Sequence, residues 1–300
     1  MPLHTRSNET ETSVGAAPQE EIRTRVTHEG HVPPNAVPAG KSPVVVGKLD
    51  GPIGGDSGLL SVLGDDERSR ILETERAPFR MIASLAISGP WGEFVGTGWF
   101  AGPRTVVTAG HCVYDKSQMG GWADQILVTP GRDGTDTPFG TTTARRFASV
   151  DRWVDDRDPD FDIGVIHLDE PLGDETGWFS VAAMTNDELN NALVNVSGYP
   201  ARPGGGQQQW WAKNRIRALT PRRVFYDVDT SGGQSGGPVY LYEDSAATVP
   251  IVVAIHAYGL GGTPSSIPLV VNSAPRIVPE VVALISQWVD ENAAAEAEPA

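Results

Sequence analysis

Short apolar runs alternate with turn residues through the middle of the chain. Runs of three to seven residues are separated by Gly, Pro and Asp: Met81–Ile87, Phe94–Phe100, Gln125–Thr129, Val194–Val196, Val224–Val228, Pro238–Leu241 and Ile251–Ile255. Runs of this length between turn signals are typical of antiparallel strands that close into barrels. The pattern therefore predicts an all-β protein built from two antiparallel β-barrels.

The two ends of the chain have a different pattern. Residues 1–60 are rich in Pro, Gly, Thr and charge and lack sustained apolar periodicity, which predicts a disordered leader or extension. After Pro279, apolar residues recur with helical spacing up to Val289, and residues 292–300 form a small acidic tail. We expect a folded domain over residues 61–291 that ends in a C-terminal helix.

Three segments carry candidate chemistry. Ser235 lies among glycines in Gly232–Pro238, His111 follows the predicted strand Thr105–Ala109, and Asp162 opens the apolar run Ile163–Leu168. A serine hydroxyl becomes a nucleophile when an imidazole takes its proton and a carboxylate orients that imidazole. We assign Ser235 as nucleophile, His111 as general base and Asp162 as its orienting partner.

The glycines around Ser235 leave its backbone uncovered. The amides of Gly233 and Ser235 can therefore point at the oxyanion of a tetrahedral intermediate. Residues 233–237 also fit the G-x-S-x-G elbow of α/β-hydrolases, in which the acid and the histidine follow the serine. Here His111 and Asp162 precede Ser235, so this alternative is disfavoured.

With these motifs, the chain resembles the chymotrypsin-like serine proteases, and most closely the bacterial glutamyl endopeptidases of the V8 type. Further matching stretches are Val62–Arg68, Ala77–Phe79, Gly110–Tyr114, Ser197–Pro200 and Tyr226–Asp227. The resemblance covers roughly residues 61–290. It implies two six-stranded barrels with the active site between them, and a peptide or protein substrate.

The resemblance also suggests the residues that choose the substrate. In glutamyl endopeptidases, a His in a strand after the nucleophile and a Thr five residues before it bind the substrate carboxylate; His256 and Thr230 match these positions. Asp229 argues for the alternative, because trypsin-like enzymes place there the carboxylate that binds Lys or Arg. We expect cleavage after Glu or Asp, with Lys/Arg specificity as the alternative.

Activation should differ from that of trypsin. Gln234 stands where trypsin-like zymogens have the Asp that binds the new amino terminus, and Gln carries no charge. In V8-like enzymes the mature amino terminus reaches the specificity pocket, and the matching start lies near Ser61. We expect residues 1 to about 60 to be removed, and their removal to sharpen selectivity.

The composition limits the classes of partner that we expect for this protein. A net charge of −15 disfavours nucleic acid and anionic membranes as partners. The single cysteine, Cys112, cannot form an internal disulfide. We expect no metal site and no cofactor, and we expect a monomer.

The N-terminus lacks the apolar core of a standard secretory signal, although related enzymes are mostly secreted, so localisation stays open. A catalytically silent, peptide-binding member of the fold is the remaining alternative.

Overall fold

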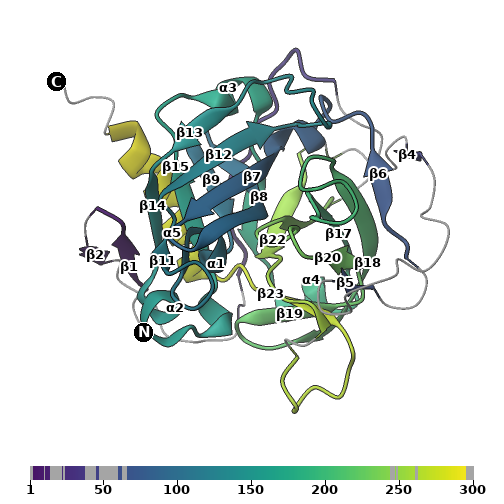
Figure 1. Ribbon diagram of the computed structural model, residues 1–300. Coiled ribbons are helices and arrows are strands. Elements are labelled where there is room, and N and C mark those ends of the chain that lie inside the picture. Colours follow the sequence, from purple (N-terminus) through teal and green to yellow (C-terminus); the bar gives the residue numbers. More distant parts are fainter. Residues whose placement is uncertain are drawn as a thin grey trace.

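The computed structural model describes residues 3–9, 11–13, 22, 24–37, 45–46, 60–62, 66–243, 247, 249–260 and 263–294. Two curled sheets lie side by side and together form the body of the protein (Figure 1). Both sheets are antiparallel apart from one parallel pair, β16 with β22. This is the predicted all-β architecture, and its barrels follow one another along the chain.

The first sheet uses the strands that precede and surround His111. In spatial order they are β13 (Thr142–Ala144), β12 (Gln125–Pro130), β7 (Ile82–Gly89), β8 (Gly92–Gly102), β9 (Thr105–Thr108), β15 (Gly164–His167) and β14 (Arg146–Val150). Trp99, Phe100 and Phe147 fill its interior without solvent exposure. Alternation of such residues with polar ones is what buries one face of each strand.

Most strands of the second sheet follow β15 along the chain. Its path runs β23 (Asn272–Pro275), β19 (Arg223–Tyr226), β18 (Trp210–Leu219), β17 (Leu193–Gly198), β21 (Pro238–Leu241), β22 (Ile251–Ile255) and β16 (Ser180–Ala183), and β6 (Ser69–Ile71) pairs with β18. A separate cluster of buried valines and alanines forms its core. The nucleophile loop lies between β20 (Thr230–Ser231) and β21.

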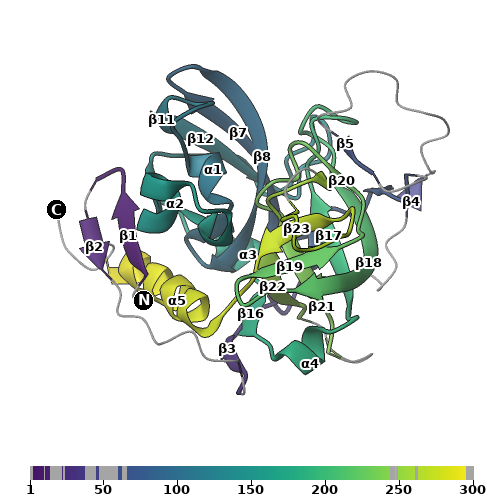
Figure 2. The ribbon, with the colours of Figure 1, turned by 90° about the horizontal axis from the view of Figure 1, so that it is seen from below.

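Few helices accompany the sheets. Short turns α1 (Gly110–Val113), α2 (Asp151–Asp156), α3 (Leu172–Thr176) and α4 (Asn186–Leu189) and the 3₁₀ turns η1 (Phe79–Met81) and η2 (Pro159–Phe161) connect the strands. The predicted closing helix is present as α5 (Pro279–Ala294), which lies against the sheets beside β16 (Figure 2). The buried Trp288 anchors it.

Both predicted tails need correction where the structure describes them. Within the leader, β1 (His4–Ser7) pairs with β14 and with β2 (Glu11–Ser13), β3 (Val26–His28) pairs with β16, and β4 (Val45–Val46) pairs with β6. Sheet edges offer unpaired amides and carbonyls, and these short segments bind them. At the other end, Asn292 is helical and buried, and its side-chain amide donates to the Arg104 carbonyl oxygen. The leader residues that are not in the ranges given above, and residues 295–300, lie outside the described residues.

Candidate active site

His111 and Asp162 come from two segments of the first barrel and meet as predicted. His111 lies in α1, one helical turn that directly follows β9, and Asp162 ends the turn η2. The Asp162 carboxylate accepts from the His111 backbone amide at 2.8 Å, and its other oxygen lies 2.7 Å from His111 Nδ1. Two contacts from one carboxylate fix both the position and the orientation of the imidazole.

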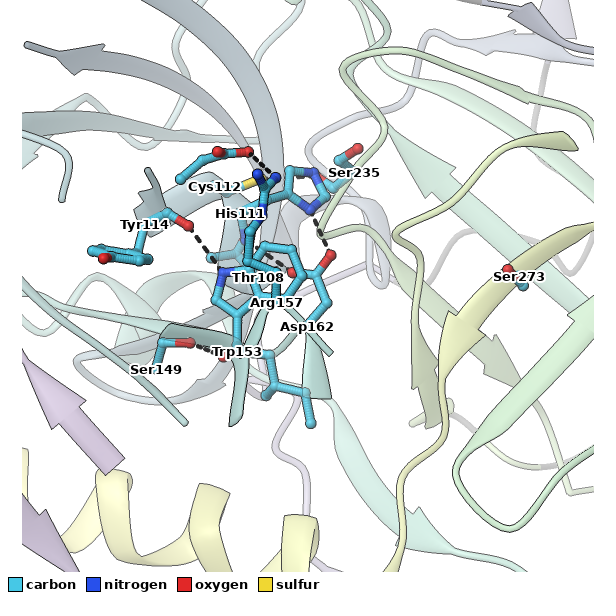
Figure 3. A network of polar contacts seen from close by, with 12 residues as sticks. Thr108, His111, Cys112, Tyr114, Ser149, Trp153, Arg157, Asp162, Ser235 and Ser273 are labelled. Atoms are coloured by element: carbon cyan, nitrogen blue, oxygen red, sulfur yellow. Dashed lines mark hydrogen bonds and ion pairs between the residues drawn. The ribbon is translucent and has the colours of Figure 1, made fainter. Parts of the chain in front are cut away.

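Ser235 reaches this pair from the second barrel. Figure 3 shows the His111 ring between the Asp162 carboxylate and the Ser235 side chain. The Ser235 carbonyl oxygen accepts from the Thr97 amide of β8 at 2.8 Å, a contact that joins the nucleophile loop to the first barrel. The structure thus brings together three residues that lie far apart in the sequence.

The peptides around Ser235 are held in place by backbone hydrogen bonds. The Gly232 carbonyl oxygen accepts from the Ala201 amide at 2.7 Å, and the Gln234 carbonyl oxygen accepts from the Gly237 amide at 2.9 Å. In a trans peptide the N–H points opposite to the C=O. The amides of Gly233 and Ser235 are therefore turned away from these acceptors. Gly233 has a φ of +96°, which favours glycine.

The environment of His111 favours its protonated form. Burial opposes the charge, but the Coulomb attraction of Asp162, a contribution from the Cys112 sulfur and the hydrogen bond to Asp162 outweigh it. Together they raise the pKa of the His111 imidazole well above its ordinary value. An imidazole so placed accepts a proton readily and holds it as imidazolium beside the carboxylate.

Thr230 and His256 lie on the second barrel near the nucleophile loop. The Thr230 hydroxyl is buried and has no hydrogen-bond partner among the described residues. His256 is also buried, its carbonyl oxygen accepts from the Gly236 amide, and its Nδ1 lies 2.6 Å from the Tyr226 hydroxyl. Burial and the charge of His111 lower the pKa of His256 to about 3, so its imidazole is neutral near pH 7.

Asp229 is engaged by the backbone at the start of the domain. Its carboxylate accepts from the Glu67 amide at 2.8 Å, and the side chain is buried. The two sequence neighbours of Glu67, Asp66 and Arg68, also hold this segment in place. Arg68, fully buried, pairs with Asp66 and donates to the Ser231 hydroxyl at 2.6 Å. The segment 66–68 is thus tied to the loop that precedes Ser235.

Two further residues near His111 and Asp162 were missed by reasoning from sequence. The Tyr258 ring lies 6.5 Å from the His111 ring, centroid to centroid, and the Arg223 guanidinium lies 5.0 Å from the Tyr258 centroid. Arg223 is buried and contributes positive charge near Asp162. Tyr258 stands two residues after His256, so its place beside a predicted site residue could have indicated it. Nothing in the sequence indicated Arg223, because only the fold brings it near Asp162.

Cys112 is a free thiol, as a single cysteine requires. Among the described residues, no group of three or more His, Cys, Asp or Glu side chains is arranged to hold a metal ion. The described helices include none that is both long and apolar enough to cross a bilayer.

Two barrels with a serine, an imidazole and a carboxylate at their junction define the class of chymotrypsin-like serine peptidases, and comparison with known proteins agrees. The sequence pattern of the trypsin-like peptidase domain matches residues 96–246. The chain is 35% identical over 234 residues to a glutamyl endopeptidase of Bacillus licheniformis, covering 77% of this chain and 69% of that protein. This chain belongs to the trypsin-like peptidase family, and within it to the V8 type.

Other relatives extend this result. The chain is 37% identical over 202 residues to a Bacillus subtilis protein named extracellular metalloprotease, covering 66% of this chain and 63% of that protein. It is 24% identical to glutamyl endopeptidase of Staphylococcus aureus, covering 68% of this chain and 58% of that protein. The chain thus spans about three fifths of the length of these last two.

Solved structures match the fold. A Glu endopeptidase in complex with MPD superposes with a TM-score of 0.66 at 25% identity, covering 76% of this chain and 99% of that one. The protease Anisep from Arthrobacter nicotinovorans gives 0.52 at 18% identity, covering 66% and 90%. The predicted family and chymotrypsin-like fold are confirmed, and the chain is a serine peptidase.

Proposed function

We propose that this peptidase cleaves peptide bonds after glutamate, or more slowly after aspartate, with His111, Asp162 and Ser235 as its catalytic triad. The observation that carries the triad assignment is the paired contact of Asp162 with both the amide and the Nδ1 of His111, beside Ser235. No other described carboxylate makes such a pair with His111.

The reaction follows from this arrangement. Ser235 Oγ attacks the scissile carbonyl carbon while His111 Nε2 takes its proton, and Asp162 stabilises the resulting imidazolium. The amides of Gly233 and Ser235 bind the oxyanion. His111 then gives the proton to the leaving amine. Water, deprotonated by His111, attacks the acyl-enzyme and releases the acid product.

Selection of an acidic side chain is supported by Thr230 and His256. The buried Thr230 hydroxyl, which has no hydrogen-bond partner in the described part of the chain, is a donor that lacks an acceptor, and a substrate carboxylate supplies one. Tyr226 is buried and its pKa is raised, so its hydroxyl keeps its proton, and we propose that it donates this proton to His256 Nδ1, 2.6 Å away. His256 Nε2 then carries the hydrogen and donates as well.

Asp229 is the residue on which the Lys/Arg alternative depends. Its carboxylate is bound to the Glu67 amide, which argues for an anchoring role. Asp229→Asn keeps an acceptor for that amide and removes the charge. We expect this variant to keep its preference for Glu, whereas an enzyme that recognises Lys or Arg through Asp229 would lose its activity on those substrates.

The leader also enters the proposal. Ser61 pairs with Thr230 across β5 (Leu60–Ser61) and β20, so an amino terminus created at Ser61 lies beside the carboxylate-binding hydroxyl. Its positive charge would favour an acidic side chain there. We propose that cleavage before Ser61 sharpens the preference for Glu. Equal Glu selectivity of the full chain and of a chain beginning at Ser61 would refute this step.

The decisive experiment measures initial rates on peptides that differ only in the residue before the scissile bond: Glu, Asp, Lys, Arg or Phe. The Ser235→Ala variant is the control. A preference for Glu that disappears with Ser235→Ala supports the proposal, and a preference for Lys or Arg assigns recognition to Asp229. Absence of cleavage, together with retained peptide binding, would identify a silent member of the fold.

A further inference from the structure

The leader forms two separate anchors on the folded domain, one on each barrel. The first anchor consists of Leu3, β1 and β2, and lies beside β14 and α2; the second consists of residues 25–31, which include β3, and lies beside β16 and α5 (Figure 2). Both belong to the segment that cleavage before Ser61 would separate from the peptidase domain. Their contacts decide whether a separated leader dissociates.

The first anchor combines strand pairing with a buried apolar side chain. β1 pairs with β14 of the first barrel in antiparallel register. Leu3 is only 3% exposed and belongs to the larger hydrophobic core cluster. The Arg6 guanidinium donates to both carboxylate oxygens of Asp155, at 2.7 and 3.0 Å. Asp155 lies in α2, which is followed along the chain by η2 and Asp162, so this anchor holds the segment that precedes the proposed catalytic carboxylate.

The second anchor contacts both barrels at once. The backbone of β3 pairs with β16 of the second barrel. The His28 ring places Nε2 2.9 Å from the Ala101 carbonyl oxygen of β8, in the first barrel, and Nδ1 3.1 Å from the Ser286 hydroxyl of α5. A carbonyl oxygen only accepts, so Nε2 donates to it, and Nδ1 of the neutral imidazole accepts from the serine. One leader residue therefore connects β16, β8 and α5.

Gly30 and His31 extend the second anchor. The Gly30 amide donates to the Ser180 hydroxyl at 2.9 Å. His31 and Trp178 exchange two backbone hydrogen bonds, of 2.9 and 2.8 Å, and their ring centroids lie 4.7 Å apart. A Cβ added at Gly30 would lie 2.3 Å from the Ser180 backbone nitrogen, so this close approach of two backbones requires glycine.

Dissociation of the leader would uncover two sheet edges. β1 and β2 lie outside β14, and β3 lies outside β16, at the ends of the two strand paths. β16 is buried along its whole length and contains no charged residue and no proline; in β14 only Arg146 is charged. Exposed edge strands usually carry charged residues or proline, because these prevent pairing with other chains. The composition of β14 and β16 therefore fits strands that stay covered.

We propose that the leader stays bound to this surface, formed by β14, α2, β16 and α5, after cleavage before Ser61, so that the mature peptidase is a noncovalent complex of two chains. The proposal rests on the cleavage step of the proposed function and replaces loss of residues 1–60 with their retention. The two anchors strengthen each other, because once one is bound the other binds intramolecularly. Linkage of this kind raises the overall affinity roughly 10²- to 10⁴-fold above that of either anchor alone.

The test uses the full chain with Ser235→Ala, in which the recognition sequence of a sequence-specific protease replaces Gly54–Gly58. The added protease makes the cut, so the outcome does not depend on the activity of Ser235. Denaturing electrophoresis verifies the cut, and size-exclusion chromatography with native mass spectrometry detects the complex. We expect one species that contains both fragments in a 1:1 ratio. Separate elution of the leader overturns this proposal and leaves the proposed triad and specificity to be judged by the peptide rates.

Variants at each anchor connect retention with the contacts described. Leu3→Ala removes core burial, and Gly30→Ala places a Cβ against the Ser180 backbone. Each should speed release of the cut leader at least about tenfold, and the double variant should lose the leader during chromatography. Glu29→Ala changes an exposed side chain next to Gly30 and is the matched control, with an unchanged release rate.

Release is followed by native mass spectrometry after addition of excess isotope-labelled leader peptide. Equal release rates for the control and for both anchor variants would contradict the proposal. If Gly30→Ala does not fold, Leu3→Ala against Glu29→Ala decides alone.

Discussion

Thr230→Val should make the free protein more stable and the enzyme less active on glutamyl substrates. The Thr230 hydroxyl is buried and lacks a partner among the described residues, so folding removes it from water without compensation. Valine has nearly the same shape and is well suited to a strand. The change removes the cost of the unpaired hydroxyl and, with it, one donor to the substrate carboxylate.

The two effects have opposite signs and comparable size. Leaving a buried hydroxyl unpaired costs about 1–3 kcal/mol, so Thr230→Val should raise the free energy of unfolding by about 1–2 kcal/mol. In a domain of this size that raises Tm by roughly 2–8 °C. A hydrogen bond to a charged group is worth about 1.5–3 kcal/mol, so kcat/KM for Glu substrates should fall about 10- to 150-fold.

Thr105→Val is the matched control. Thr105 begins β9 of the first barrel, and its hydroxyl is likewise buried without a partner among the described residues. We expect it to gain stability similarly without any change in the ratio of Glu to Leu cleavage. Thermal unfolding of both variants and kcat/KM on paired Glu and Leu peptides provide the measurements. If Thr230→Val lowers Tm and leaves the Glu-to-Leu ratio unchanged, the reasoning about this hydroxyl is refuted.

Three further predictions concern the catalytic loop, the triad and acid stability. Gly233→Ala should reduce kcat about 100- to 1000-fold at nearly constant KM, because a Cβ there would lie 2.5 Å from the Ala201 amide nitrogen and displace the oxyanion donor. Asp162→Asn should lower kcat about 10⁴-fold and, by removing the charge that raises the pKa of His111, shift the acidic limb of the pH–rate profile to lower pH. His256 has a folded pKa of about 3, below its ordinary value, so the unfolded chain binds the proton first as pH falls. Stability should therefore decrease between about pH 6.5 and 3 by up to about 5 kcal/mol. In urea unfolding over that range, the free energy of unfolding of His256→Gln should depend less steeply on pH than that of the wild type.

The order of chemical motifs and the strand pattern were readable from sequence. Apolar runs between turn residues predicted most strands of both barrels, because burying one face of a strand imposes a local pattern. Helical spacing after Pro279 predicted α5, although the helix extends past Asn292 into the predicted tail. The segments of His111 and Ser235 were recognisable by the glycines and small residues around them, and the segment of Asp162 by the apolar run that it opens.

What the sequence could not provide was the partner of each buried polar group. That Asp229 binds the Glu67 amide, that Arg68 supports the Ser231 loop and that Arg223 lies near Asp162 are contacts between distant segments. Leader strands add to the sheets because the folded edges offer backbone partners, which no periodicity within residues 1–60 reveals. Short stretches of sequence determine which chemical groups and which strands can form locally. Burial, charge balance and cavity shape arise only when tertiary packing brings those stretches together.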